Sequence, residues 1–133
     1  MVKVVDINAE LADRPVLNSR GPETTEAEAD AAFATLAPYR EGGIFAGRFM
    51  GEGPWERHQN GDELVHILKG ETTLTIIVDG EHQELQMAAG MLTVVPRGYW
   101  HRFRSPKGVT VLTATPHPTD HVWTEDPTAD ADL

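Results

Sequence analysis

The sequence predicts an all-β barrel or sandwich with a short helix near its N-terminus. From Gly42 onward, short runs of strand-forming residues are separated by turn residues, and no helical pattern lies between them. Asp79-Gly80 stands between two such runs and is typical of a two-residue β-hairpin. Before these runs, Thr25 to Glu28 has the pattern of a helix capping box. A chain of 133 residues is long enough to bury a core as one domain.

The N-terminal part is expected to hold one helix and two short extended segments. Residues 2–7 alternate enough to form a strand, and Val16-Leu17 is a second candidate. Apolar residues then recur at helical spacing and predict a helix at about 25–37, which Pro38 ends. We expect the side of this helix that carries Phe33 to pack on the main body.

We interpret residues 1–133 as a single domain. Residues 1–42 form an N-terminal extension, residues 43–115 form the barrel, and residues 116–133 form a C-terminal segment with an acidic tail that lies over the surface. The candidate strands of the barrel are 43–50, 54–59, 62–69, 71–79, 81–87, 91–96, 99–104 and 109–115.

Charge and composition exclude several classes of function. The formal net charge is −10, from 21 acidic and 11 basic residues, so neither nucleic acid nor a membrane is expected as a partner. The first ten residues carry Lys3, Asp6 and Glu10 where a signal peptide needs an apolar stretch, and we expect a cytoplasmic protein. The chain has no cysteine, so any metal ion must have nitrogen and oxygen ligands.

Two histidines and one carboxylate are predicted to point into the barrel. Within the strand 62–69, Glu63 shares a face with the apolar Val65 and Ile67, because alternate side chains of a strand lie on the same side. A buried carboxylate is costly unless a cation or hydrogen bonds compensate it. His101 likewise shares a face with Phe103.

His58 precedes the Asn60-Gly61 turn, which can bring it next to Glu63. Two imidazoles and a carboxylate form the ligand set of a mononuclear iron site that activates oxygen, and Mn, Ni, Zn and Co also fit.

Two motifs in these segments resemble those of the cupin superfamily. The second cupin motif, G-x5-P-x-G-x2-H-x3-N, is matched by Gly90, Pro96, Gly98 and His101, with Ser105 in place of the final Asn. The resemblance covers roughly residues 43–115. It implies a jelly-roll barrel, also called a double-stranded β-helix, in which both motifs supply metal ligands.

The first cupin motif, G-x5-H-x-H-x3,4-E-x6-G, is matched at its end, where six residues separate Glu63 from Gly70. Its start departs from the pattern. If His58 is the second histidine, Glu56 occupies the place of the first; if His58 is the first, Asn60 replaces the second and the spacing to Glu63 is one residue short. We favour the former reading.

The resemblance therefore implies one divalent metal ion, held by His58, Glu63 and His101, with Glu56 as a fourth ligand or as a general base. The mixture of imidazoles and carboxylates favours Fe, Mn or Zn over Cu, and Ni or Co also fit. The alternative is a metal-free cupin, in which both histidines hydrogen-bond to Glu63.

Several further residues have two readings each. Arg48 is a candidate anchor for a substrate carboxylate or an exposed edge arginine, and Trp55 and Trp100 line the pocket mouth or pack at strand ends. His117 and His121 are interpreted as structural or rim residues.

The leading hypothesis is a metal-dependent enzyme that acts on a small polar or carboxylated molecule. Cupins include dioxygenases, isomerases, lyases and decarboxylases, and the two-histidine, one-carboxylate set weakly favours the first. The alternatives are a non-catalytic module that binds or senses a small molecule, and a metal-free relic. The resemblance also suggests a homodimer.

Overall fold

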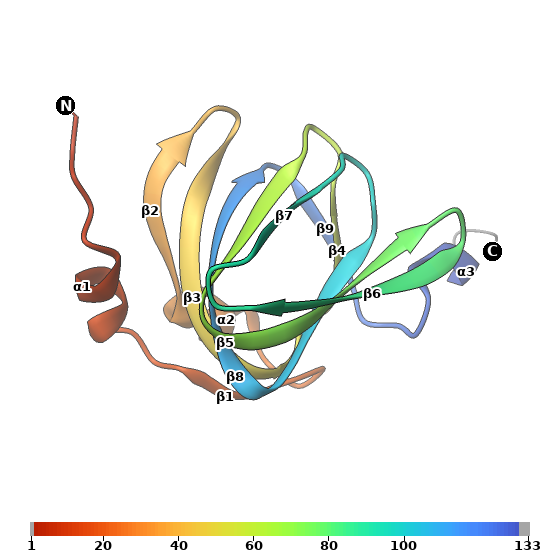
Figure 1. Ribbon diagram of the computed structural model, residues 1–133, viewed down its shortest axis with the longest axis horizontal. Helices are drawn as coiled ribbons and strands as arrows, with labels where there is room; N and C mark the ends of the chain where they lie inside the picture. The colour runs from red at the N-terminus through yellow and green to blue at the C-terminus, as the bar shows by residue number, and fades with distance from the viewer. Residues whose placement is uncertain (1, 131–133) are drawn as a thin grey trace.

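The computed structural model describes residues 2–130, which form one curled sheet with three short helices (Figure 1). The strands are β1 (Leu17–Arg20), β2 (Phe33–Tyr39), β3 (Gly42–Glu52), β4 (Trp55–His58), β5 (Glu63–Val78), β6 (Glu81–Ala88), β7 (Leu92–Val95), β8 (His101–Pro116) and β9 (Thr119–Val122). The helices are α1 (Ile7–Ala12), α2 (Glu26–Ala32) and α3 (Pro127–Asp130). No helix within residues 2–130 is long and apolar enough to cross a membrane.

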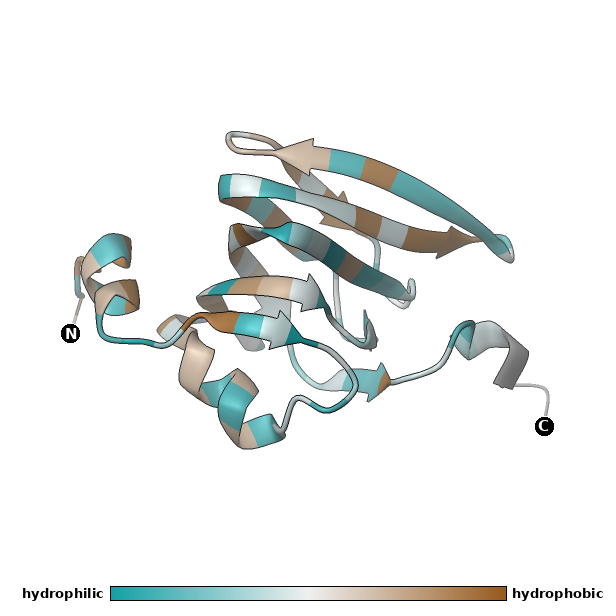
Figure 2. Ribbon diagram, turned by 90° about the horizontal axis from the view of Figure 1, so that it is seen from below, coloured by the Kyte–Doolittle hydropathy of each residue, from teal (hydrophilic) through white to brown (hydrophobic). Residues whose placement is uncertain are grey.

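The long strands β5 and β8 form the centre of the sheet. β8 pairs antiparallel with β3, β4 and β5, while β5 also pairs with β6 and β7. Figure 2 shows hydrophobic and hydrophilic segments alternating along several strands, as expected where one face of a sheet is buried. The buried face carries the core, which includes Phe49, Val65, Ile67, Leu74 and Val111.

Two pairs of predicted strands are continuous in the structure. Residues 62–69 and 71–79 form β5, and residues 99–104 and 109–115 form β8. Gly70 lies at the bend, with a φ of +77°, and a Cβ there would lie 2.3 Å from the carbonyl oxygen of Gly108. A glycine that the sequence indicated as a turn therefore lets two strands bend together without a break.

The N-terminal part differs from the sequence prediction in two places. The strand predicted at residues 2–7 is wrong, since Asp6 caps helix α1, its side chain accepting a hydrogen bond from the backbone N–H of Ala9. The capping box of Thr25 and Glu28 is confirmed, but helix α2 ends at Ala32, well before Pro38. The following residues form β2, which pairs antiparallel with β3.

The C-terminal segment contributes a strand that the sequence prediction missed. β9 pairs antiparallel with β4, and Thr119 lies opposite His58 in this register. The segment therefore completes the sheet next to one of the candidate metal ligands.

Arg48 lies on β3 and fixes helix α1 to the sheet. Its Nη2 donates to the carbonyl oxygens of Leu11 and Arg14, both at 2.6 Å. We expect Arg48→Met to lower the free energy of unfolding by about 1–3 kcal/mol, because two carbonyl groups lose a charged donor. Chemical denaturation measures this loss, and hydrogen exchange is expected to speed up in residues 7–14.

Arg104→Met is the matched control, since this arginine is exposed on β8. Equal effects of the two substitutions, or unchanged exchange in residues 7–14, would contradict the role of Arg48.

Candidate metal centre

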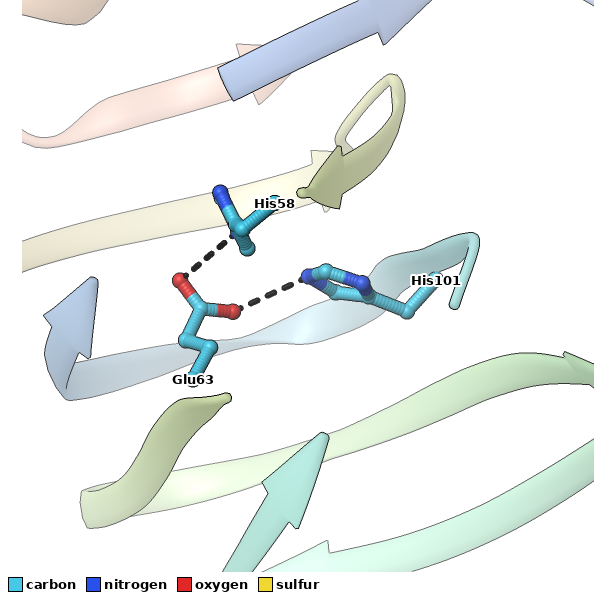
Figure 3. A group of neighbouring side chains, drawn as sticks. All are labelled: His58, Glu63 and His101. Carbon is cyan, nitrogen blue, oxygen red and sulfur yellow. Dashed lines mark hydrogen bonds and ion pairs between the residues drawn. The ribbon is translucent and has the colours of Figure 1, made fainter. Parts of the chain in front are cut away.

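Three side chains from three strands converge inside the barrel (Figure 3). His58 ends β4, Glu63 begins β5 and His101 begins β8. One potential ligand atom from each lies within 4.8 Å of the others. The residues are 2%, 4% and 1% exposed, respectively, so the group is shielded from solvent.

The local fold explains this convergence. The turn between β4 and β5 places His58 and Glu63 side by side, and it is held by two hydrogen bonds to the loop before β8. The N–H of Gly98 donates to the carbonyl oxygen of His58, and the N–H of Arg97 donates to the carboxylate of Asp62, each at 2.9 Å. Asp62 thus caps a turn, while strand alternation directs Glu63 inward as predicted.

The carboxylate of Glu63 contacts three buried groups. Its Oε1 lies 2.9 Å from Nε2 of His101, and its Oε2 lies 3.1 Å from Nε2 of His58. The hydroxyl of Thr115 donates to Oε2 at 2.6 Å. Burial raises the pKa of Glu63, but hydrogen bonding and positive charge from His101 and the close approach of His58 outweigh it, and the pKa is lowered from 4.5 to about 2.

The proton positions follow from the neighbours of the two rings. Nδ1 of His101 lies 3.1 Å from the carbonyl oxygen of Tyr99, which can only accept, so this nitrogen carries a proton. A neutral His101 then directs the lone pair of Nε2 at the Glu63 carboxylate. Burial opposes protonation of His101, yet the Glu63 carboxylate outweighs burial and raises the pKa of the ring.

His58 has a similar arrangement. Its Nδ1 lies 2.9 Å from the hydroxyl of Thr119, which can accept a hydrogen bond from it. Its Nε2 is buried, and although it is close to Glu63 it has no hydrogen bond of acceptable geometry within the described chain. Such a buried, unsatisfied nitrogen is costly unless another group binds it.

These observations fit a divalent metal ion. Two imidazole nitrogens face one carboxylate, and a cation between them would take the place of the proton on Nε2 of His101 and give Nε2 of His58 a partner. Each ring is also held through Nδ1 by a protein oxygen, which is typical of histidines that bind metals. Two histidines and one carboxylate suit Fe(II), Mn or Zn and leave positions for other ligands.

Glu56 and Asn60, the two candidates for the replaced histidine, have different positions. Glu56 lies outside the group of three but lines the same cavity as Glu63, and its charge also favours protonation of His101. Asn60 is exposed, and its Nδ2 donates to the carbonyl oxygen of His117 at 2.7 Å. Of the two, only Glu56 lines the cavity.

A cavity of about 310 Å³ adjoins the metal centre. Glu56 and Glu63 line it together with several phenylalanines, helix α2 and the segment that contains His117 and His121. These two histidines thus lie at its wall, in agreement with their interpretation as rim residues.

The three other predicted pocket residues do not line this cavity. Arg48 binds the carbonyl groups near helix α1. Trp55 is buried, its Nε1 donates to the carbonyl oxygen of Thr124 at 2.9 Å, and the guanidinium of Arg102 lies 4.7 Å from its ring centroid. Trp100 packs under the guanidinium of Arg57. Both tryptophans therefore agree with the second reading of the sequence, in which they pack at strand ends.

The sequence interpretation missed three residues of the site. Thr115 shares the buried face of β8 with Val111 and Thr113, so strand alternation would have found it. Thr119 belongs to a strand that was not predicted. Arg20 lines the cavity from the end of β1, where a shift in register hides the alternation.

Comparison with known proteins identifies the fold. Residues 50–115 match the family model of the cupin domain. The chain belongs to the cupin superfamily. This cupin is 46% identical over 50 residues to an acireductone dioxygenase of Rhodopseudomonas palustris, a match that covers 38% of this chain and 30% of the relative. The match thus spans less than a third of the length of that relative.

Two solved structures show the same architecture. The hydroquinone 1,2-dioxygenase PnpCD, in complex with Cd2+ and 4-hydroxybenzonitrile, is similar with a TM-score of 0.56 and 16% identity over 63% of each chain. A cupin-2 domain protein of Shewanella frigidimarina has a TM-score of 0.51 and 20% identity, over 68% of this chain and 80% of that one. At these identities the likeness shows the fold.

We expect His101→Ala and Glu63→Gln to abolish tight binding of a divalent ion, because either change removes one of three ligands. Isothermal titration with Mn2+ or Zn2+ is expected to show an affinity at least about 100-fold weaker, and Thr119→Val, which removes only the partner of His58, about 10–100-fold weaker. Circular dichroism checks that each barrel is folded.

His66→Ala is the matched control, since His66 lies on β5 with its side chain on the face opposite Glu63. Stoichiometric binding of unchanged affinity in the His101 variant would remove this residue from the site.

The stability of metal-free protein is expected to fall in acid through Glu63. Its pKa is about 2 in the folded chain and ordinarily 4.5, so its stabilising contribution is present above pH 4.5 and is lost as the pH falls towards 2. The loss is on the order of 3 kcal/mol, since one pKa unit corresponds to about 1.36 kcal/mol. Chemical denaturation in chelator, from neutral to acidic pH, measures it.

Glu63→Gln supplies the comparison, and the difference in stability between wild type and variant is expected to narrow as the pH falls. The raised pKa of His101 has the opposite effect on the pH dependence of stability. The stabilising contribution of His101 is fully present below pH 6.5 and is lost as the pH rises through the raised pKa. A difference that stays constant across the acid range would contradict the role given to Glu63.

Proposed function

We propose that this cupin is a divalent-metal-dependent dioxygenase that acts on a small polar or carboxylated molecule. The observation that carries the proposal is the buried group of His58, Glu63 and His101, of which Glu63 lines a cavity. The 46% identity over 50 residues to an acireductone dioxygenase supports reaction with dioxygen over the isomerase, lyase and decarboxylase chemistries. Because that match covers 30% of the relative, it supports a class of reaction and no particular substrate.

When bound, the ion would supply a Lewis acid with positions free for oxygen and substrate. The protein contributes the orientation of its ligands. Thr119 and the carbonyl of Tyr99 hold the two imidazole rings, and Thr115 holds one oxygen of Glu63. These partners fix the ligand atoms before a metal ion arrives, which lowers the cost of assembling the site.

Glu56 is the cavity carboxylate that lies outside the metal group. We propose it as the general base that accepts a proton from a substrate hydroxyl. It lies half-buried on β4, opposite His101 in the strand pairing, so a substrate at the metal centre would be within its reach. Its position supports this role better than a role as a fourth ligand.

The cavity wall favours a small molecule with an apolar part. Phe45, Phe49, Phe103 and Val111 line one part of it, while Thr113 and Thr115 offer hydroxyl groups near Glu63. Apolar walls keep bulk water from the site and strengthen polar interactions within it.

Oxygen consumption tests the proposed reaction. Metal-free protein is reloaded with Fe(II), Mn2+ or Ni2+ and is offered enediols, hydroxylated aromatic acids and keto acids. We expect oxygen uptake with at least one substrate and metal, no uptake by His101→Ala, and a roughly 100- to 10,000-fold lower kcat for Glu56→Gln, which retains the metal ligands.

His66→Ala and metal-free protein are the controls. If small molecules bind at the cavity without oxygen uptake under any metal, the non-catalytic binding module is the better description and the proposed reaction is wrong.

The expected homodimer and cytoplasmic location stay predictions. We propose the outer face of the sheet for the dimer contact, because Leu92 and Val94 on β7 are 59% and 50% exposed there.

A further inference from the structure

We infer that Arg20 binds the anionic group of the substrate, so that this cupin selects small carboxylates or enolates with an aromatic or otherwise apolar body. The identity of the bound molecule as a substrate rests on the proposed function; the anion site itself rests on the contacts of Arg20. Arg20 ends β1, and its side chain lines the cavity that adjoins Glu63.

The side chain of Arg20 is largely buried, and its guanidinium has no hydrogen-bond partner among residues 2–130. Its side chain is 9% exposed, and within residues 2–130 its nearest carboxylate oxygen is Oε1 of Glu56, at 3.9 Å from Nη2. That distance permits attraction but exceeds a hydrogen bond. The guanidinium carries five N–H donors in a planar fork and lines the cavity, and no acceptor in the described part of the chain lies within hydrogen-bonding distance of it.

Aromatic rings hold the guanidinium in place. The central carbon of the group lies 4.5 Å from the ring centroid of Phe49 and 5.3 Å from that of Phe33. Gly53 leaves the space beside it, since a Cβ at this position would lie 3.0 Å from Nη1 of Arg20. The side chain is thus positioned by stacking, which keeps its N–H groups free for a ligand.

Electrostatics favour an anion over a neutral ligand. Burial lowers the pKa of Arg20 and the Glu56 carboxylate opposes this change, but an arginine stays protonated in proteins. A buried, charged fork is compensated best by a carboxylate, which accepts two parallel hydrogen bonds. Glu26 and Asp30 also line the cavity, but both are exposed, so solvent and salt screen their repulsion.

The same cavity determines the remainder of the ligand. Phe33, Phe45, Phe49 and Phe103 supply apolar wall, and a volume of about 310 Å³ suits a molecule the size of a substituted aromatic acid. With its anionic group at Arg20, such a molecule would extend along the phenylalanines, within the cavity that Glu56 and Glu63 also line.

Binding of a matched pair of probes tests the inference without turnover. The acid 3-phenylpropionate and the neutral 3-phenylpropionamide are titrated into wild-type and Arg20→Met protein, metal-free and loaded with Zn2+. We expect wild type to bind the acid in the millimolar range or better and Arg20→Met to bind it roughly 10- to 100-fold more weakly, with the affinity for the amide unchanged.

Two further variants and one control variant extend the test. Arg20→Lys retains the charge but loses the fork, and is expected to lose part of the affinity for the acid. Gly53→Ala keeps the arginine and displaces its guanidinium, with a severalfold loss expected even if Arg20→Met does not fold. Arg97→Met, which changes an exposed arginine outside the cavity, is expected to bind as wild type does.

Three results would overturn the inference: no binding of the acid by wild type at millimolar concentration, equal losses for acid and amide in Arg20→Met, or full affinity for the acid in that variant. The outcome is separable from that of the proposed reaction. Binding of the acid that depends on Arg20, without oxygen uptake on any substrate, would leave the anion site standing and remove the dioxygenase. Oxygen uptake with an unchanged KM in Arg20→Met would support the dioxygenase and remove the anion site.

Discussion

The site depends on one buried carboxylate. Glu63 is 4% exposed, and its charge is tolerated because His58, His101 and Thr115 surround it. His58 lies on β4, and His101 and Thr115 lie on β8, so the requirement to compensate this charge links the start of β5 to β4 and to both ends of β8. The pairing of β9 with β4 adds Thr119 behind His58. The barrel therefore closes around the candidate metal centre, to which segments far apart in the chain contribute.

The two ends of β8 have different roles in this arrangement. His101 at its start presents a ring nitrogen to Glu63, and Thr115 near its end presents a hydroxyl to the same carboxylate. One strand can do both because it bends where Gly108, with a φ of +94°, lies against Gly70. Replacing Gly108 would strain the backbone of β8, which sets the distance between these two groups, and replacing Gly70 would strain β5 where it lies against Gly108.

The sequence predicted the three central residues because strand alternation and motif spacing depend only on local order. Glu63 and His101 share faces with apolar neighbours, and the structure places both inward. Arg48 and Arg20 illustrate what local order leaves open: which arginine faces the cavity depends on where helix α1 packs and how β1 shifts in register. Thr119 was equally hidden, because its strand forms only by pairing with β4.

The charges of the cavity connect the candidate metal centre with Arg20. Among the cavity's buried and half-buried groups, Glu56 and Glu63 bring two negative charges and Arg20 brings one positive charge, while solvent screens the exposed Glu26 and Asp30. A divalent ion held by neutral histidines would leave the site with one net positive charge. Since uncompensated charge is costly among these largely buried groups, a substrate with a single negative charge would balance them better than a neutral or dianionic one. Arg20 and the metal centre thus favour the same class of ligand for one electrostatic reason.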